Sequence, residues 1–305
     1  VNAGNYMDYI GMYSASNASK ITNIIFDGAD AINIFFIGNS FTMDSVTHLP
    51  GMLAAAGIKN VNMVHMYYGG RLMSQYNSGW ATDADYTCYT CNAGATSWTT
   101  SSGKSLKSVA ESRKWDIVTI QEHTGNAAAW VWNSTAKANF TGVINHIKES
   151  QADAQIYYIM SQAYQNMDKI GSGSKPSITW TDQAGMYKVI TDFAQAAMRD
   201  CDIDGIIPTG TMLQNLRTTS LNNDLGLTRD GYHMDYGLSR YAASCTVFES
   251  IITPLTGVNL DNNSYRYAES GEGKTPVTNA NAPVALLAAR NAIATPYAVT
   301  DMSSY

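Results

Sequence analysis

The sequence is short of charged residues. Of its 305 residues 14% are charged, against about 25% in a typical soluble domain. The 19 Lys and Arg and 25 Asp and Glu give a net charge of −6. Uncharged polar residues fill the deficit, and the mean hydropathy is −0.18. This composition excludes disorder driven by net charge, a coiled coil, and a basic protein that binds nucleic acid.

Long apolar runs are also absent from the sequence. A membrane-spanning helix needs roughly 18 consecutive apolar residues. The longest run, residues 32–37, is short and has the character of a buried strand. The sequence therefore predicts no membrane span.

Cysteine is scarce, with four residues in the chain. Cys88 and Cys91 form a Cys-x-x-Cys in a polar stretch, without the strand–helix unit of a redox motif. A structural zinc site would need a second ligand pair at similar spacing. We expect a local disulfide or unreactive thiols here, and no metal. We expect Cys201 and Cys245 to be buried as small apolar residues.

The sequence begins at Val1 and carries no signal peptide, which indicates a processed or truncated chain. Asn, Tyr, Trp and Thr are abundant while charges are few. Such a composition suits a secreted or periplasmic protein that handles carbohydrate. We therefore expect a location outside the cytoplasm.

Segments typical of strands alternate with segments typical of helices over most of the chain. The first strand is a continuous apolar run, as expected for a strand buried on both faces. Alternation of this kind favours right-handed crossovers and a parallel sheet with helices on both faces. The predicted strands are 31–37, 61–68, 115–121, 156–160 and 205–208, and the predicted helices are 45–56, 133–150, 181–198 and 234–252.

The predicted architecture is one three-layer α/β domain over residues 31–256, with a five-stranded parallel sheet. Residues 1–30 lack periodicity and are expected to be an N-terminal extension. Residues 71–112 are expected to be an insertion over one rim. Residues 257–305 contain a helical patch, 284–293, and are expected to be a C-terminal extension that packs on the same domain.

Chemically versatile residues follow the predicted strands. In an open parallel sheet, ligands bind at the carboxyl ends of the strands. Gly38-Asn39-Ser40 follows the first strand, Gly69-Gly70-Arg71 the second, and residues 121–126 the third. Asp230-Gly231-Tyr232-His233 precedes the last helix. These four segments are expected to meet at one rim.

These segments resemble the SGNH (GDSL-type) hydrolase superfamily, which comprises esterases and acyl-transfer enzymes on a flavodoxin-like sheet. Gly38-Asn39-Ser40 is similar to the Gly-Asp-Ser block that holds the nucleophile, with Asn in place of Asp. Gly69 or Gly70 stands where the family places its oxyanion glycine. Asp230-Gly231-Tyr232-His233 matches its Asp-x-x-His block. The resemblance covers about residues 31–252 and implies a flavodoxin-like fold.

The third segment, Gln121 to Asn126, departs from the family's Gly-x-Asn-Asp block. It looks like the Gln-containing variant of some carbohydrate acetylesterases and of an uncharacterised bacterial branch. Gln121 or Asn126 would then supply the side-chain donor of an oxyanion hole. The position at the strand end favours Gln121.

Ser40, Asp230 and His233 have the chemistry of a catalytic triad. A serine hydroxyl is a poor nucleophile until a base removes its proton, and an imidazole titrates near neutrality. Asp230 precedes His233 by three residues, so the two can share one face of a turn. Nothing in this set requires a metal or a cofactor. The predicted oxyanion donors are the amides of Ser40 and of Gly69 or Gly70, and the side chain of Gln121 or Asn126.

Other residues near this rim are candidates for substrate binding, each with a structural alternative. Asn39 adjoins the serine. Arg71 could bind a carboxylate such as that of a uronic acid, although most arginines in such loops pair on the surface. His123 is the main rival for the role of base. Trp130 and Trp132 could form a platform for a sugar ring or pack under the following helix.

The sequence thus predicts a serine esterase that removes short acyl groups, acetyl first, from a carbohydrate through an acyl-Ser40 intermediate. No long apolar segment is present to hold a fatty chain. Two alternatives stay open: acyl transfer by the same site, and a non-catalytic carbohydrate-binding protein on this fold. The expected partner is a small-molecule or polysaccharide ester, not nucleic acid.

Overall fold

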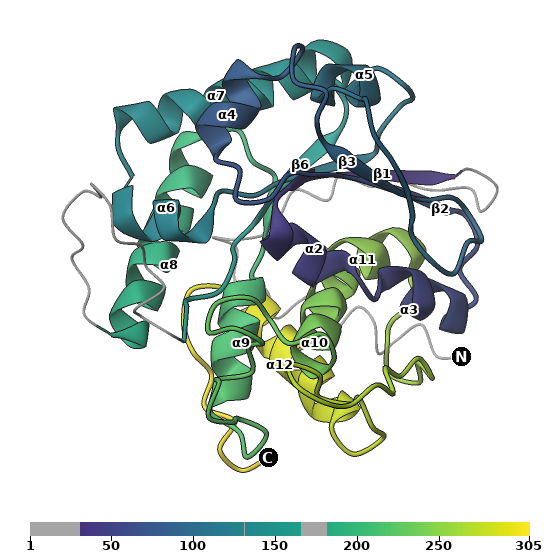
Figure 1. The fold of residues 1–305 in the computed structure, drawn as a ribbon, viewed down its shortest axis with the longest axis vertical. Helices are drawn as coiled ribbons and strands as arrows, with labels where there is room; N and C mark the ends of the chain where they lie inside the picture. The colour runs from purple at the N-terminus through teal and green to yellow at the C-terminus, as the bar shows by residue number, and fades with distance from the viewer. Residues whose placement is uncertain (1–30, 131, 166–181) are drawn as a thin grey trace.

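The computed structural model describes residues 31–130, 132–165 and 182–305, with backbone only at 129 and 130 (Figure 1). The predicted N-terminal extension, residues 1–30, lies outside the described residues. The strands are β1 (Ile32–Gly38), β2 (Val61–Tyr67), β3 (Thr87–Cys91), β4 (Thr99–Ser101), β5 (Ile117–Ile120), β6 (Gln155–Ile159) and β7 (Gly205–Ile207). The helices are α2 (Ser40–Val46), α3 (Leu49–Ala55), α4 (Met73–Ser78), α5 (Leu106–Ala110), α6 (Thr124–Trp130), α7 (Ser134–Ser150), α8 (Gln183–Asp200), α9 (Thr209–Arg217), α10 (Leu238–Val247), the π-helical η2 (Phe248–Ile252), α11 (Thr253–Thr256) and α12 (Ala282–Ala294).

The strands form one sheet in the order β4-β3-β2-β1-β5-β6-β7. Strands β2, β1, β5, β6 and β7 pair in parallel, and each overlaps a segment predicted as a strand. Among these five the order is second, first, third, fourth and fifth along the chain, which is the flavodoxin-like order. The predicted count of five is wrong, because the sheet has seven strands.

The two additional strands come from the predicted insertion, residues 71–112. Strands β3 and β4 pair antiparallel and extend the sheet beyond β2. Every residue of β4 is exposed, so the strand has no apolar alternation that the sequence could reveal. Threonine, a good strand former, is the one signal that both segments carry. The insertion therefore widens the sheet at its edge.

Cys88 and Cys91 lie on opposite faces of β3, because side chains alternate along a strand. Each belongs to a different hydrophobic core, and both thiols are free. The expectation of a local disulfide is therefore wrong, and the alternative of buried thiols is what the structure has. Burial raises the pKa of the Cys91 thiol. Cys245 is fully buried as expected, whereas Cys201 is half-buried.

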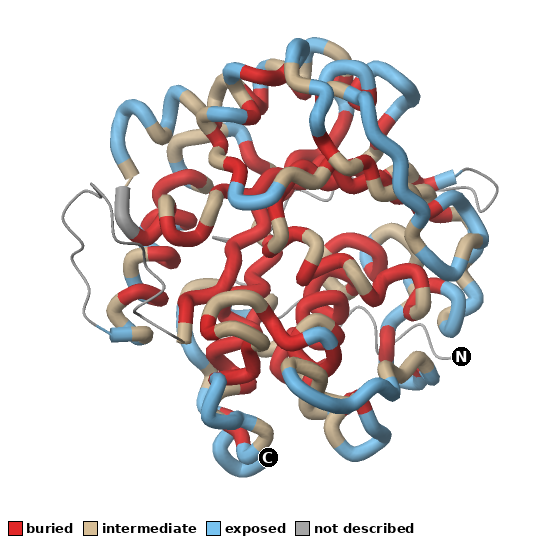
Figure 2. The backbone as a smooth tube through the Cα atoms, viewed as in Figure 1, coloured by how far each residue is buried: buried red, intermediate tan, exposed pale blue. Residues whose placement is uncertain are grey.

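Helices cover both faces of the sheet, with α4, α5, α7 and α8 on one side and α2, α3, α9, α10 and α12 on the other (Figure 1). Strand β1 contributes side chains to the hydrophobic cores on both faces of the sheet. Ile34 and Phe36 belong to one core, and Phe35 and Ile37 belong to the other. Figure 2 shows the buried residues concentrated in the sheet and on the inner faces of the helices. Burial on both faces explains why β1 is a continuous apolar run.

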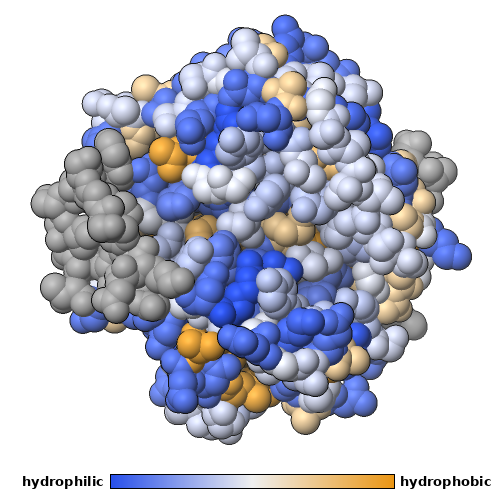
Figure 3. Space-filling view, viewed as in Figure 1, coloured by the Kyte–Doolittle hydropathy of each residue, from blue (hydrophilic) through white to orange (hydrophobic). Residues whose placement is uncertain are grey.

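The described surface is largely polar. Strongly hydrophilic residues gather near the centre of the view in Figure 3, and apolar colour is confined to small patches. This agrees with a composition in which uncharged polar residues replace charged ones. The exposed large apolar side chains are Leu225, Tyr236, Val299 and Tyr305.

The chain after β1 departs from the prediction of a single helix over 45–56. It forms two helices, and the first begins at Ser40 itself. Asn39 caps that helix, since its Oδ1 accepts the Phe41 N–H at 3.0 Å. Pro50 stands in the first turn of α3, where a missing N–H costs nothing. Ser40 is thereby placed on a defined helix instead of a free loop.

The C-terminal part packs into the same core as α9 and α10. Helix α12 contacts both, and it contains the predicted patch 284–293. The predicted helix 234–252 begins four residues later, at Leu238, and its last five residues are π-helical. Among the described helices, none has the length and apolarity needed to cross a bilayer.

Candidate active site

Ser40, His233 and Asp230 form a continuous chain of hydrogen bonds. Ser40 Oγ lies 2.8 Å from His233 Nε2, and His233 Nδ1 lies 2.7 Å from Asp230 Oδ2. The Asp230 Oδ1 also accepts the backbone N–H of His233 at 2.8 Å. These are hydrogen-bond distances between a nucleophile, a base and the carboxylate that orients the base. The fold brings the three together although 193 positions separate Ser40 from His233.

The carboxylate of Asp230 is held in its charged form. Partial burial raises the pKa of Asp230, but hydrogen bonds from the ring and the backbone of His233 and from the backbone of Tyr232 outweigh that effect. The pKa therefore lies below its ordinary value. An ionised Asp230 can fix the His233 ring in one orientation and stabilise the imidazolium.

Hydrogen bonds join the loops that carry these residues. The Asn39 N–H donates to Gln121 Oε1 at 3.1 Å, and Asn39 Nδ2 donates to the Arg71 carbonyl at 3.1 Å. The loops that follow β1, β2 and β5 are thus bonded to one another. Gln162, after β6, donates from Nε2 to the Tyr232 carbonyl at 2.7 Å. As predicted, these segments meet at the carboxyl ends of the strands.

Gln121 does not offer its amide to the site. The side chain is wholly buried, its Oε1 accepts from Asn39 and from the Thr42 hydroxyl, and its Nε2 donates to the Glu122 carbonyl. Because the wholly buried Gln121 presents no exposed N–H, the structure favours the other alternative, Asn126. The position of Gln121 at the strand end is correct, but its side chain turns inward and braces the turn before Ser40.

Asn126 is the alternative donor, and its side chain is half-buried. Helix α6 positions it, and its backbone N–H donates to the His123 carbonyl at 2.9 Å. Its side chain also hydrogen-bonds the carboxylate of Glu122. An amide group has two N–H donors, so one bond to Glu122 leaves the other for an oxyanion.

Gly69 and Gly70 form an exposed turn after β2. The turn is closed by the Arg71 N–H donating to the Tyr68 carbonyl at 3.4 Å. Gly70 has a φ of 67°, a left-handed conformation that glycine adopts without strain. A side chain at Gly70 would meet no other atom within 4 Å, so the backbone here is open to a ligand.

Glu122, which was not among the predicted site residues, joins two of these loops. It is 4% exposed, and its Oε1 accepts the N–H of Met73 at 3.0 Å and that of His123 at 2.7 Å. Burial raises the pKa of Glu122 to about 7, against the lowering effect of its hydrogen bonds from Met73, His123 and Asn126. This buried carboxylate therefore braces both the glycine turn and the loop that carries Asn126.

We expect Glu122 to make the protein less stable as the pH rises. Its pKa is raised in the folded chain from 4.5 to about 7, so the folded form binds the proton more tightly than the unfolded form. The associated stability is complete below the unfolded pKa and is lost as pH rises through the folded one, by about 3 kcal/mol. Glu122→Gln keeps the shape without the charge. Urea unfolding from about pH 5 to about pH 8 should show a flatter profile for Glu122→Gln.

The matched control is Glu111→Gln, which removes a half-exposed carboxylate that pairs with Lys107 at 3.7 Å. Its unfolding free energy should run parallel to that of the wild type. A constant difference between Glu122→Gln and wild type across this pH range would contradict the role of Glu122 in the pH dependence.

Asp44 is a second carboxylate that was not among the predicted site residues. It is wholly buried on α2. Its Oδ1 lies 3.0 Å from Arg229 Nη1 and 2.6 Å from Arg240 Nη2. Its Oδ2 accepts the N–H of Met234 at 3.0 Å. Because Met234 follows His233, Asp44 fastens the segment that carries the candidate base to the helix that carries Ser40.

The side chains of Arg71 and Asn39 are already engaged by other residues of the protein. The Arg71 guanidinium is buried between the rings of Tyr68 and Tyr86, 4.5 and 4.8 Å from their centroids, and pairs with Asp83. Asn39 is wholly buried, and its side chain caps α2. Neither side chain is placed to bind substrate, so both predictions of substrate binding are wrong.

Trp132 packs under the helices, which is the structural alternative to a role in binding a sugar ring. Its ring lies 5.3 Å from that of Phe140 and 5.2 Å from that of Phe193, and its Nε1 donates to Asp200 at 2.8 Å. The prediction of a sugar platform is wrong for Trp132. The side chain of Trp130 lies outside the described residues.

Three of the other histidines, His48, His65 and His123, form hydrogen bonds with groups other than Ser40. His123 is half-buried, and its Nδ1 accepts the Asn126 N–H at 3.3 Å. His48 is bonded to Tyr265 and to a backbone carbonyl, and burial lowers its pKa to about 4. Burial lowers the pKa of His65 to about 3, so this residue is neutral in the core.

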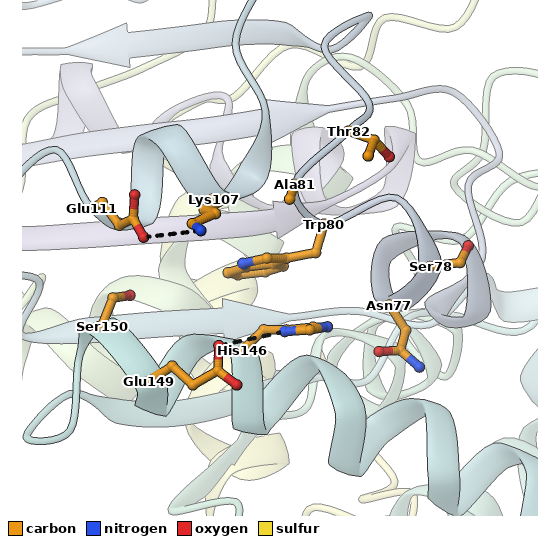
Figure 4. Close-up of a pocket in the computed structure, with 10 residues that line it drawn as sticks. All are labelled: Asn77, Ser78, Trp80, Ala81, Thr82, Lys107, Glu111, His146, Glu149 and Ser150. Carbon is orange, nitrogen blue, oxygen red and sulfur yellow. Dashed lines mark ion pairs between the residues drawn. The ribbon is translucent and has the colours of Figure 1, made fainter.

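His146 belongs to a pocket on the layer of α4, α5 and α7, shown in Figure 4. Its ring stacks on that of Trp80 with centroids 5.3 Å apart and an interplanar angle of 12°. The pocket has a volume of about 290 Å³. Its flanks carry the ion pair of His146 with Glu149 and that of Lys107 with Glu111. His146 therefore has no part in the Ser40 site.

In the described ranges of the chain, no group of three or more His, Cys, Asp and Glu side chains is arranged to hold a metal ion. The residues around Ser40 instead combine a hydroxyl, an imidazole with an ionised partner, and amide donors. A set of this kind can take a proton from a hydroxyl and stabilise a negatively charged oxygen, which is what acyl transfer needs.

Comparison with known proteins gives one family and several similar structures. The model of a family described as "Domain of unknown function (DUF4886)" matches residues 33–286. A crystal structure of a DUF4886 family protein from Bacteroides uniformis is 26% identical, with a TM-score of 0.70, over 90% of this chain and 98% of that one. A search of curated proteins gave no significant match.

Two further solved structures are similar at lower scores. A carbohydrate esterase family 3 protein from Talaromyces cellulolyticus is 12% identical, with a TM-score of 0.46, over 75% of this chain and all (100%) of that one. A GDSL-like lipase from Parabacteroides merdae is 12% identical, with a TM-score of 0.47, over 72% of this chain and 95% of that one.

Proposed function

The chain belongs to the DUF4886 family, and we propose that it is a serine esterase that removes short acyl groups, acetyl in the first place, from a carbohydrate. The observation that carries this proposal is the chain of hydrogen bonds Ser40–His233–Asp230, at 2.8 and 2.7 Å. A polar surface and a composition poor in charge support a carbohydrate substrate and a location outside the cytoplasm.

In the first half of the proposed reaction, Ser40 Oγ attacks the carbonyl carbon of the ester while its proton passes to His233 Nε2. Asp230 stabilises the imidazolium that forms. The tetrahedral intermediate then collapses, its bond to the alcohol oxygen breaks, and His233 returns the proton to that oxygen. The sugar leaves with a free hydroxyl, and the acyl group stays on Ser40.

In the second half, a water molecule gives a proton to His233 and attacks the acyl carbon. The bond to Ser40 Oγ breaks, the proton returns to that oxygen, and the carboxylic acid leaves. His233 thus acts as base and then as acid in each half.

We assign the negative oxygen of the tetrahedral intermediates to three donors. These are the N–H of Ser40, an N–H of the Gly69–Gly70 turn, and the side-chain amide of Asn126. The exposed glycine turn and the half-buried Asn126 support this assignment. Removal of one such donor typically costs about 10²–10³ in rate, which is the loss expected for Asn126→Ala.

Covalent labelling tests the proposed nucleophile directly. A fluorophosphonate reacts with a serine only when a base activates its hydroxyl, so we expect one label per chain, on the peptide that contains Ser40. Hydrolysis of p-nitrophenyl acetate should stop in step with labelling. Peptide mapping by mass spectrometry measures the site.

Ser78→Ala is the matched control, because Ser78 is exposed on α4 in the opposite layer. This variant should be labelled on Ser40 as completely as the wild type. A label on another serine would overturn the assignment of the nucleophile. An unlabelled protein without esterase activity would instead favour a non-catalytic protein on this fold.

A further inference from the structure

Two arginines beside Ser40 carry more positive charge than their protein partners balance. Arg229 and Arg240 both contact the one buried carboxylate of Asp44, at 3.0 and 2.6 Å. Two guanidinium groups against one carboxylate leave an excess of one positive charge. The excess lies in a wall formed by α2, the 229–236 segment and the start of α10.

Among the described residues, no carboxylate other than Asp44 forms an ion pair with either arginine. Asp230 is engaged with His233 at 2.7 Å, and Glu269 pairs with Lys274 at 2.7 Å. Glu272 is exposed next to Gly273, the residue that packs on the side chain of Arg229. Within the described residues it forms no ion pair with either arginine. The charge is therefore available to an anion from outside.

The two guanidinium groups are held in place with donors to spare. Arg240 uses Nε and Nη2 on Asp44, and Arg229 uses Nη1 on Asp44 and on the Met234 carbonyl. In the described part of the chain, Nη1 of Arg240 and Nη2 of Arg229 have no acceptor. The side chains are 12% and 14% exposed, so solvent reaches them in part.

Tyr236 fixes the arginines from the other side. Its ring is 38% exposed, and the guanidinium carbons of Arg229 and Arg240 lie 4.6 and 4.7 Å from its centroid. A cation fixed by a carboxylate and an aromatic face loses little freedom when it binds an anion. The geometry is that of a prepared anion site.

This wall lies one helical turn from the candidate nucleophile. Asp44 follows Ser40 by four residues on α2, which places their Cβ atoms about 6 Å apart. Tyr67 connects the wall to the glycine turn: burial and Tyr89 raise the pKa of Tyr67, Asp44 raises it further, and the two arginines lower it. Its hydroxyl lies 3.4 Å from the position of a side chain at Gly69. An anion on the arginines would thus lie near the first turn of α2, which begins at Ser40.

We propose that Arg229 and Arg240, with the ring of Tyr236, bind a carboxylate of the substrate, so that the ester cleaved at Ser40 is that of an acylated sugar acid. This inference rests on the proposed esterase function and names its substrate class. Guanidinium groups bind carboxylates through paired, charge-assisted hydrogen bonds. Arg71, the arginine that the sequence suggested for this task, is buried elsewhere.

The test compares two substrates that differ in one charge: an O-acetylated methyl galacturonoside and its uncharged 6-methyl ester. We expect kcat/KM to be about 10–100 times higher for the charged form. The ratio should fall as salt screens the charge. Arg240→Gln should bring it close to one. Arg290→Gln, which removes an arginine paired with Glu249 and Asp261, should leave the ratio unchanged.

A ratio near one in the wild type would overturn the subsite. An Arg240→Gln variant that lowers both rates equally would do the same, because it would show that the arginine only supports the fold. Binding to Ser40→Ala separates this inference from the esterase function. Calorimetry should show methyl galacturonoside binding at least about ten times more tightly than methyl galactoside, and equal binding would overturn the subsite whether or not any ester is cleaved.

Discussion

Ser40→Ala is expected to lower kcat for p-nitrophenyl acetate by about 10⁴–10⁶, because loss of a triad nucleophile removes the covalent route altogether. The remaining rate would come from donors that polarise the ester without attacking it. The variant should fold normally, since Ser40 is half-buried and its hydroxyl contacts only the ring of His233 among the described residues. Steady-state kinetics with purified protein measure the loss.

A double variant makes this prediction specific to a triad. Residues that act as one unit show effects that do not add. Ser40→Ala with His233→Ala should therefore be about as slow as Ser40→Ala alone. If the losses in kcat of the two single variants multiplied instead, His233 would act independently of Ser40. Full activity in Ser40→Ala would remove the serine from the mechanism.

Asp44→Ala is expected to lower the free energy of unfolding by about 3–5 kcal/mol, which is typical when one partner of a buried ion pair is removed. Asp44 is wholly buried, and the two arginines it faces are 14% and 12% exposed. Without it they carry unbalanced charge, and the N–H of Met234 loses its acceptor. Because Met234 adjoins His233, kcat should fall as well. Urea unfolding and ester hydrolysis measure the two effects.

Two further variants serve as comparisons for Asp44→Ala. Asp44→Asn keeps an oxygen for Met234 but not the charge, so its loss should be smaller. Asp192→Asn removes an ion pair with Lys188 whose side chains are 56% and 72% exposed. Exposed pairs contribute about 0–1 kcal/mol, so this variant should unfold almost as the wild type does. Equal stability of Asp44→Ala and Asp192→Asn would contradict the role assigned to the Asp44 cluster.

The parallel part of the sheet could be predicted because its strands are buried on both faces. Burial on both faces makes β1 and its neighbours short apolar runs bounded by glycine. The place of Ser40 followed from the first of those runs, and that of Asp230 with His233 from the helix predicted after them. The antiparallel strands could not be found in this way, since β4 is fully exposed and its pairing depends on an edge that only the folded sheet presents.

The directions in which polar side chains point could not be predicted from the sequence. Gln121 stands at the predicted strand end, yet its amide turns inward to the turn before Ser40. Arg71 follows the glycine turn, yet two tyrosine rings and Asp83 hold it inside. Asp44 gave no signal beyond its position, because its partners come from a segment 185 and 196 residues away. Such contacts are settled by packing between distant segments.

The distance along the chain between Ser40 and His233 also has a consequence in time. The two are 193 residues apart, and ribosomes add about 5–20 residues per second. The proposed nucleophile therefore leaves the ribosome about 10–40 s before its base. Through that interval β1, β2 and α2 can form, yet the serine has no group to take its proton. On the proposed mechanism, a growing chain is inert toward esters until the segment that carries His233 has been made and docked.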